Sequence, residues 1–578
     1  QLSFGVWFQP FQSNEALALS QFGQATFPSL TQFLAGTTSS FLFDPAPTEM
    51  NWRSFLGAFY AQDVIRVTPK LTVSLGFRDE FSTGWNEAHG RAANYTFTDG
   101  VISTDPRIAN SVFTVNNAKW LPQPRIGLAW IPFSSKTVFR AGFGMYIDLQ
   151  DALGYRTDQN APFNSTYSIA TLTVSSLPLD PSAPVPAGAK LVPGGVQPDM
   201  QMPTLISWSL RIDQSLSPNT ALTIGYVGSH GYHEVIGIDA NQPFPTICSA
   251  APCPADYPTV TPNTAPPPPV VTFANGFPIG SPLAGAPVPA GSYYIPLGTP
   301  KANPSPAITN TWTWFSEGDS SYNALQVDLR RRLSHGLSFR GVYTWSKALD
   351  DGDSLNQTTA NNAPGLVSNP FHLRSDWGPA TYEVRNMGVI NVLYDLPFGS
   401  GQAFANSLEG FGNVAVSGWS VASIVTLQAG FPFTPQLSYN PSNNGDTRNP
   451  VRPFVNPGFT GPVTLGKPAQ WFNPAAFIAP PSTMGFYGNL GRDTYAGPGL
   501  ATWDFSVLKD TRINERFHLQ FRTEIFNILN RANFGTPNLI VFTPPTAANP
   551  TGVSGTAGAI TSTSTSSRQV QFALKLLW

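Results

Sequence analysis

The chain of 578 residues is poor in charged side chains, in cysteine and in long apolar runs. Only 11% of its residues are charged, whereas an average soluble domain has about 25%. The 32 basic and 34 acidic residues nearly cancel, so the sequence gives no electrostatic reason to expect a nucleic acid partner. No uninterrupted apolar run reaches the roughly 18 residues that a membrane-spanning helix needs, which excludes such helices.

The only two cysteines, Cys248 and Cys253, lie close together in a Pro-rich segment. This spacing predicts a small disulfide formed in an oxidising compartment, and the alternative is two free thiols. The chain begins at Gln1 with no signal peptide, so we expect the 578 residues to be the C-terminal part of a longer protein.

Aromatic residues are abundant at 12%, and the end of the chain shows how they are placed. From Val570 every second residue is apolar, and the chain ends on Trp578. This pattern is typical of the last strand of a bacterial outer-membrane barrel, which has lipid on one side and its lumen on the other. Phe572 and Trp578 are therefore candidates for the signal read by the barrel-assembly machinery. The alternative is an edge strand of a soluble β domain.

The same alternation recurs at 71–78, 205–213 and 518–525. It predicts strands with an apolar face toward lipid and a polar face toward a watery lumen, because a packed core would not accept unpaired charges. The predicted lipid-facing residues are Leu75, Trp208, Leu210, Phe521 and Leu574. The predicted lumen-facing charges are Arg78, Arg211, Arg340, Arg522 and Glu524.

Short and long connections alternate between these segments. Short turns are expected at 68–70, 134–136, 217–219, 334–336 and 514–515, with 398–416 as a longer member of this set. Long stretches are expected at 12–52, 84–122, 150–202, 231–320, 350–379, 435–500 and 534–566, and 21–36 could hold one short helix. About 14 strands result, an even number as in outer-membrane barrels. The sequence thus predicts an all-β, antiparallel transmembrane barrel with short periplasmic turns and long extracellular loops.

Several segments resemble a known family, notably 58–81, 124–148, 343–351, 418–435 and 491–538. They are similar to the C-terminal barrel of Oar-like TonB-dependent receptors, in which a carboxypeptidase-regulatory-like domain and a plug precede the barrel. The resemblance implies a 22-stranded barrel, of which residues 1–578 would hold about the last 14. It also implies an inner-membrane energy-coupling partner. The plug, the TonB-contacting box and the first strands are not within the 578 residues.

Other polar groups have simpler interpretations than a chemical site. His230 and His233 lack a nearby third metal ligand, so exposed histidines are favoured. The group Asp350, Asp351, Asp353 and Asn356, like the segment 443–446, lacks the full spacing of a calcium loop and reads as an acidic turn. No catalytic motif is present, so neither an enzyme nor a cofactor is predicted.

The function expected from these observations is uptake of a scarce ligand by an outer-membrane receptor. Trp312 and Trp314 are candidates for ligand contact, with an outer aromatic girdle as the alternative. The lumen-facing charges are candidates for contact with a plug or a ligand, with salt bridging and hydration as the alternative. The rival functions are a passive or structural barrel and a secreted β-rich binding protein. The ligand is open among siderophores, cobalamin, glycans and peptides.

Overall fold

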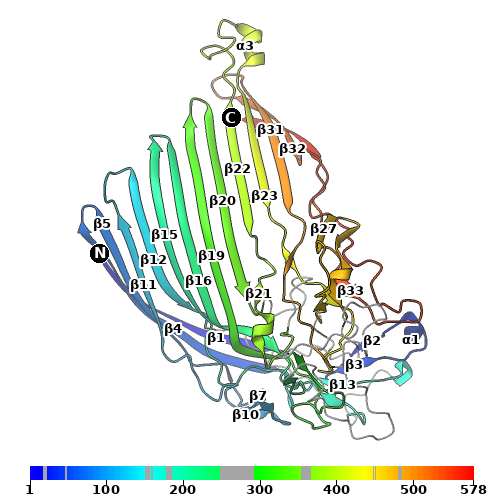
Figure 1. Ribbon diagram of the computed structural model, residues 1–578. Helices are drawn as coiled ribbons and strands as arrows, with labels where there is room; N and C mark the ends of the chain where they lie inside the picture. Colours follow the sequence, from blue (N-terminus) through cyan, green and yellow to red (C-terminus); the bar gives the residue numbers. More distant parts are fainter. Residues whose placement is uncertain are drawn as a thin grey trace.

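The computed structural model describes residues 1–16, 23–45, 48–149, 157, 160–176, 185–247, 292–352, 366–446, 448, 451–479 and 485–578. A single curved antiparallel sheet forms a tall wall, and a body of folded loops lies at one end of it (Figure 1). Among the described residues, no helix has the length and apolarity needed to cross a membrane.

The wall follows the order of the sequence, each long strand pairing with the next along the chain. Its strands are β1 (Leu2–Glu15), β4 (Met50–Thr68), β5 (Leu71–Ser82), β11 (Leu121–Trp130), β12 (Thr137–Ile147), β15 (Thr204–Ser217), β16 (Thr220–Ile238), β19 (Thr313–Ser334), β20 (Leu337–Asp350), β22 (Asn386–Asp395), β23 (Trp419–Gln428), β31 (Leu500–Arg512), β32 (His518–Phe526) and β34 (Gln569–Leu577). Two short strands, β6 (Asn86–Glu87) and β21 (Gly378–Pro379), pair with β4 and β20. The predicted antiparallel strands are confirmed.

The strand register confirms which of the predicted residues share a face of the wall. Leu75, Ile126, Phe143 and Trp208 are consecutive cross-strand partners from β5 to β15. Beside this row runs a row of small residues, Ser74, Gly127, Gly142 and Ser209, on the opposite face because successive side chains alternate. The register places all five predicted lumen charges on the face of the small row.

The short turns lie together at one end of the wall (Figure 1). They occupy residues 69–70, 131–136, 218–219, 335–336 and 513–517. The turn from β19 to β20 needs positive φ at both central residues, 52° at His335 and 75° at Gly336, and this is the geometry that matches the twist of two paired strands. The turn from β22 to β23 departs from this pattern, because it holds α3 (Gly410–Val416).

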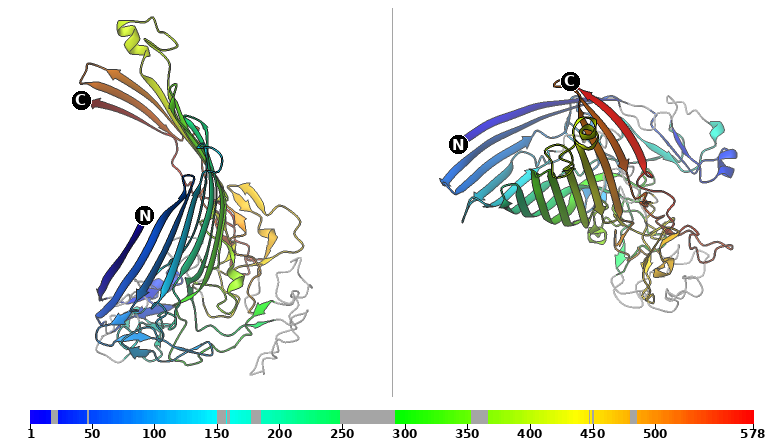
Figure 2. Two further views of the ribbon diagram at one scale, coloured as in Figure 1. Left: turned by 90° about the vertical axis from the view of Figure 1, so that its left-hand side faces the viewer. Right: turned by 90° about the horizontal axis from the view of Figure 1, so that it is seen from above.

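The wall does not close into a barrel. Within the described residues β1 pairs with β4 and β34 pairs with β32, and neither has a second neighbour in the sheet. Figure 2 shows the two outer strands well apart on the curved wall.

The long connections fold at the other end of the wall into small sheets and short helices. These are β2 (Gln24–Thr26), α1 (Leu30–Leu34), β3 (Ser40–Phe43), β7 (Ala92–Asn94), β8 (Phe97–Thr98), β9 (Val101–Ile102), β10 (Arg107–Ala109), β13 (Tyr167–Ile169), η1 (Val174–Ser176), β14 (Lys190–Leu191), β17 (Thr246–Ile247), β18 (Tyr293–Tyr294), η3 (Leu373–Asp376), β24 (Pro432–Phe433), β25 (Gln436–Leu437), β26 (Phe454–Val455), β27 (Thr464–Lys467), β28 (Gln470–Phe472), η4 (Pro474–Ala476), β29 (Phe477–Ile478), β30 (Tyr495–Ala496) and β33 (Ile540–Phe542). The helix α1 confirms the short helix expected within 21–36.

Apolar cores lie within this loop body and where it meets the wall. One buries Met50, Trp52, Trp85 and Met200, and another buries Phe433, Phe472, Phe477 and Val541. The predicted loop bounds 231–320 are wrong at both ends, because β16 continues to Ile238 and β19 begins at Thr313. These extensions lie at the end of the wall away from the short turns, where Ile238 and Trp314 pack in apolar cores with residues of the loops.

Candidate functional site

The polar face of the wall carries a row of paired charges near the short turns. The Asp213 carboxylate accepts hydrogen bonds from Arg140 Nε at 3.2 Å, from Arg211 Nε at 2.7 Å and from the Thr223 hydroxyl at 2.8 Å. On the other side of Thr223 in the same row lies Asp328. Two acidic side chains thus sit among several arginines on the face that the membrane leaves to water.

Arg340 and Asp328 form the best-oriented pair in this row. The guanidinium donates from Nη2 at 2.7 Å and from Nε at 3.1 and 3.2 Å to the two carboxylate oxygens. The remaining predicted charges lie farther along the same face. Arg78 contacts Glu80 at 2.5 Å, Arg522 Nε donates to Gln520 at 2.7 Å, and Glu524 stands opposite Ser506 and Gln571. A role in ligand contact stays a prediction for each of them.

The row of small residues forms the floor of a groove of about 300 Å³. Gly142 and Gly144 leave the backbone of β12 bare, and the ring of Tyr146 lies across Gly144. Above this floor the Arg125 guanidinium lies 4.6 Å from the centre of the Tyr146 ring. The groove therefore offers a backbone surface bordered by one cation, Arg125, and one carboxylate, Asp63.

Trp312 precedes β19 and Trp314 lies near the start of β19, at the end far from the short turns, where the wall meets the loop body. Trp314 is 8% exposed and packs in the core with Met50 and Trp52, and Trp312 packs against the same core. Neither indole is on the exposed aromatic surface of the wall, so their structural role is to join the start of β19 to the loops. Ligand contact by either indole stays a prediction.

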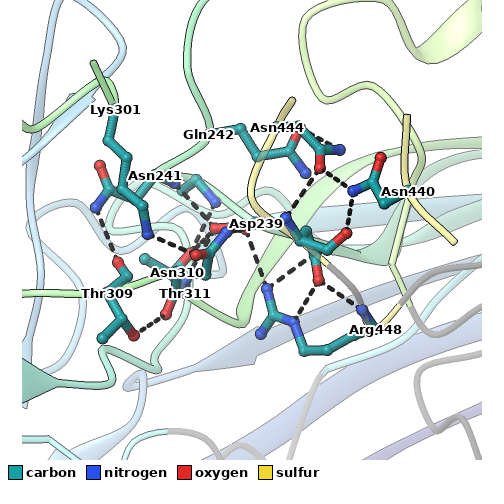
Figure 3. A network of polar contacts seen from close by, with 12 residues as sticks. Asp239, Asn241, Gln242, Lys301, Thr309, Asn310, Thr311, Asn440, Asn444 and Arg448 are labelled. Carbon is teal, nitrogen blue, oxygen red and sulfur yellow. Dashed lines mark hydrogen bonds and ion pairs between the residues drawn. The ribbon is translucent and has the colours of Figure 1, made fainter. Parts of the chain in front are cut away.

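A buried polar network fastens the loops to one another (Figure 3). Asp239 lies directly after β16. Its carboxylate lies 3.1 Å from Nη2 of Arg448 and accepts a hydrogen bond from the Thr311 backbone N–H at 2.8 Å. Arg448 also contacts Asp446 at 2.8 Å. Burial raises the pKa of Asp239, and the neighbouring Arg448 charge opposes that rise. The Asp239 carboxylate therefore joins three chain segments that are distant in sequence, those around Asp239, Thr311 and Arg448.

A second network lies around Arg492. Its guanidinium contacts the carboxylate and the backbone carbonyl of Asp350, and its Nε donates to the Asp376 carbonyl at 2.6 Å. Arg452 reaches the Asp376 carboxylate at 2.5 Å. Next to Asp350, burial raises the pKa of Asp351 to about 6. Sequence reasoning missed Arg448, Arg452 and Arg492, because no local pattern marks a partner so far along the chain.

His230, His233 and Asp351 each have a backbone partner in the structure. The Nδ1 atoms of His230 and His233 lie 2.9 Å and 3.3 Å from the backbone carbonyls of Ser320 and Ser316. Asp351 accepts the Asp319 backbone N–H at 2.9 Å. In the part of the chain that the structure describes, no group of three or more metal-ligating side chains gathers. Asp353, Asn356 and the Cys248–Cys253 pair lie outside the described residues.

These features define a class of protein: a membrane-spanning β wall with one apolar face and a charged inner face. The loop body at its end forms the mouth of the wall. Comparison with family models agrees. The model described as "Outer membrane beta barrel domain" matches residues 1–571. The chain belongs to this family and resides in the outer membrane. The alternative of a secreted β-rich protein is therefore wrong.

Comparison with curated proteins finds no match. Among solved structures, the chain is similar to the ferric-catecholate import receptor Fiu from K12 E. coli (11% identity, 92% of this chain, 45% of that one, TM-score 0.37). It is also similar to the siderophore receptor PiuA from Acinetobacter baumannii (10% identity, 92% of this chain, 44% of that one, TM-score 0.41). A third similar structure is a mutant of the ferric enterobactin receptor PfeA from Pseudomonas aeruginosa (10% identity, 100% of this chain, 54% of that one, TM-score 0.41). The chain spans about half the length of these structures.

Proposed function

We propose that the chain forms the wall and mouth of an outer-membrane receptor that admits a scarce ligand. The observation that carries this proposal is the folding of the long loops into a body held by the buried network around Asp239 and Arg448. A mouth that is ordered before the ligand arrives loses less entropy on binding. A passive pore or a structural barrel has no such need.

We propose further that import is driven by an inner-membrane energy-coupling protein, as the resemblance to Oar-like receptors implies. We assign the chain no catalytic role. The candidate ligand contacts are the inner-face charges Arg78, Arg211, Arg340, Arg522 and Glu524 together with Trp312 and Trp314. The ligand classes are those of the broad family, including siderophores, the ligand that the names of PiuA and its relatives carry.

The free edges of β1 and β34 support the further proposal that residues 1–578 are part of a larger barrel. Hydrocarbon offers no hydrogen-bond partner to backbone N–H and C=O groups, so an unpaired edge is costly within a membrane. Additional strands of the same protein would pair both edges.

Two measurements on the full-length protein test the function. In planar bilayers, a receptor closed by a plug should show no steady conductance, whereas a passive pore conducts. In cells, uptake of a labelled ferric siderophore, cobalamin, oligosaccharide or peptide should require both this protein and the inner-membrane coupling protein. Steady conductance, or uptake that persists without the coupling protein, would contradict the proposal.

A further inference from the structure

The connection between β22 and β23 differs from the other short turns. It runs from Leu396 to Gly418 and carries α3, whereas the neighbouring hairpins close within a few residues. Figure 1 shows α3 standing beyond the ends of β22 and β23, on the side of the short turns. A projecting segment at this level lies where the wall leaves the membrane on the periplasmic side.

The outward surface of this projection is apolar. Phe411 is 87% exposed and Phe404 is 58% exposed, and Leu408 and Val414 are also exposed. Phe411, Val414 and Ala415 lie on α3 at spacings of three and four residues, so they share one side of the helix, and Leu408 lies just before it. The only charged residue between Leu396 and Gly418 is Glu409.

The polar side of α3 points inward, toward its own loop. The Asn413 side-chain oxygen accepts the Ser400 backbone N–H at 2.7 Å, and the Phe398 and Phe404 rings pack 5.7 Å apart at the base. A surface helix of a water-soluble domain has the opposite arrangement, with its apolar side against the core. The exposed apolar surface of α3 therefore calls for an apolar environment.

Trp419 connects α3 to the outer face of the wall. The register places Trp419 in one row with Lys509, Phe521 and Leu574, which is the lipid-facing row of the last strands. The indole Nε1 donates to the Ala415 carbonyl at 2.9 Å, and Lys509 Nζ lies 5.9 Å from the centre of the indole ring. Tryptophan and lysine are the residues that gather where a membrane protein meets lipid headgroups.

We propose that residues 396–418 form an interfacial foot that lies on the periplasmic leaflet of the outer membrane. Phe404 and Phe411 enter the phospholipid, and Trp419 with Lys509 marks the headgroup level beside them. The apolar side of α3 is thus continuous with the lipid-facing surface of the wall. The foot fixes the height of the wall in the bilayer at its short-turn end.

The test uses spin labels on the full-length protein in phosphatidylethanolamine and phosphatidylglycerol vesicles. Both cysteines are first replaced (Cys248→Ser, Cys253→Ser), and the label is attached at Phe411→Cys. Matched controls carry it at Leu574→Cys, on the lipid-facing strand β34, and at Glu515→Cys, in the exposed turn from β31 to β32. Collision rates with oxygen, which favours lipid, and with a water-soluble nickel chelate are then compared.

The label at position 411 should show the oxygen-dominated ratio of position 574. A nickel-dominated ratio like that of position 515 would overturn the proposal by placing the foot in water. Low access to both reagents would also overturn it, by indicating a protein partner. A second variant keeps the test independent of one site: with the label at Val414→Cys, adding Phe404→Glu and Phe411→Glu should shift the ratio from the lipid value to the water value.

Discussion

The rings of Phe521 and Phe572 lie on the neighbouring strands β32 and β34, with their centroids 6.3 Å apart and their planes only 15° from parallel. They share the outer face with Leu574, the cross-strand partner of Phe521. The end of the chain is thus packed into the lipid-facing surface while its last residue, Trp578, stays exposed. This arrangement leaves both candidate signal residues accessible to another protein.

If Phe572 and Trp578 are the assembly signal, replacing both with Ser in the full-length protein should abolish insertion into the outer membrane. The measurement is the heat-modifiable barrel band in isolated outer membranes. Gln571→Ser with Lys575→Ser is a matched control, because these residues lie on the other face of the same strand. An unchanged band in the Phe572/Trp578 variant would show that the signal lies elsewhere.

Which side chains of the wall point toward lipid can be tested at two adjacent residues of β15. Arg in place of the lipid-facing Leu210 should lower the free energy of unfolding by about 2–4 kcal/mol if the residue lies near the bilayer midplane. Arg in place of Ser209 should cost far less, because that side chain points into the watery interior. Urea titration in phospholipid vesicles measures both, and equal costs would contradict the assigned register.

The loop predicted at 231–320, the longest in the chain, is predicted to form much of the outer ligand contact surface. A deletion of 243–300 would also remove Tyr294 and Ile295, which are fully buried in the loop body. A sharper variant exploits the pairing of Ile247 with Tyr293, since residues 248–292 can be replaced by Asn-Gly, a two-residue hairpin turn. The wall should fold, and ligand affinity should fall more than tenfold, a loss above about 1.4 kcal/mol. Normal affinity would move attention to 435–500.

Removing the Arg448 side chain should destabilise the mouth far more than removing the Arg340 side chain destabilises the inner face. Arg448→Ala leaves Asp239 and Asp446 buried without their guanidinium, a change that typically costs about 3–5 kcal/mol. Arg340→Ala, whose partner is reached by water, should change stability little. Hydrogen exchange of residues 301–311 and 440–446 should accelerate in the Arg448 variant alone. Equal exchange in both variants would mean that the network does not hold the loops.

The mouth should also respond to pH through Asp351. Because its pKa of about 6 in the folded protein is above the ordinary 3.8, the folded state prefers the protonated carboxyl. Its contribution is fully present below about pH 4 and is lost as the pH rises through about 6. Asp351→Asn keeps an acceptor for the Asp319 N–H and should remove this dependence. Exchange of the Asp319 amide, corrected for intrinsic rates, should then vary with pH in the natural protein only.

The period of two in the sequence was sufficient to predict the wall. In segments such as 205–213 and 518–525 each apolar residue alternates with a polar one, and a membrane strand needs nothing else to set its two faces. The turns were equally local, because Gly336 adopts a positive φ without a steric penalty and His335 tolerates it better than most residues. The strand ends near Ile238 and Thr313 were missed, because there packing against the loop body, not lipid, extends the strands.

What the sequence by itself determined is therefore the membrane sheet: its strands, its short turns and which residues share a face. Only the tertiary structure decided how the mouth is built. Asp239 and Arg448 are joined across a long stretch of chain, and Met50 packs with Trp314, through contacts that no local pattern encodes. The physical reason is that facing follows from the geometry of one strand, whereas a buried ion pair or a shared core requires segments far apart in sequence to meet.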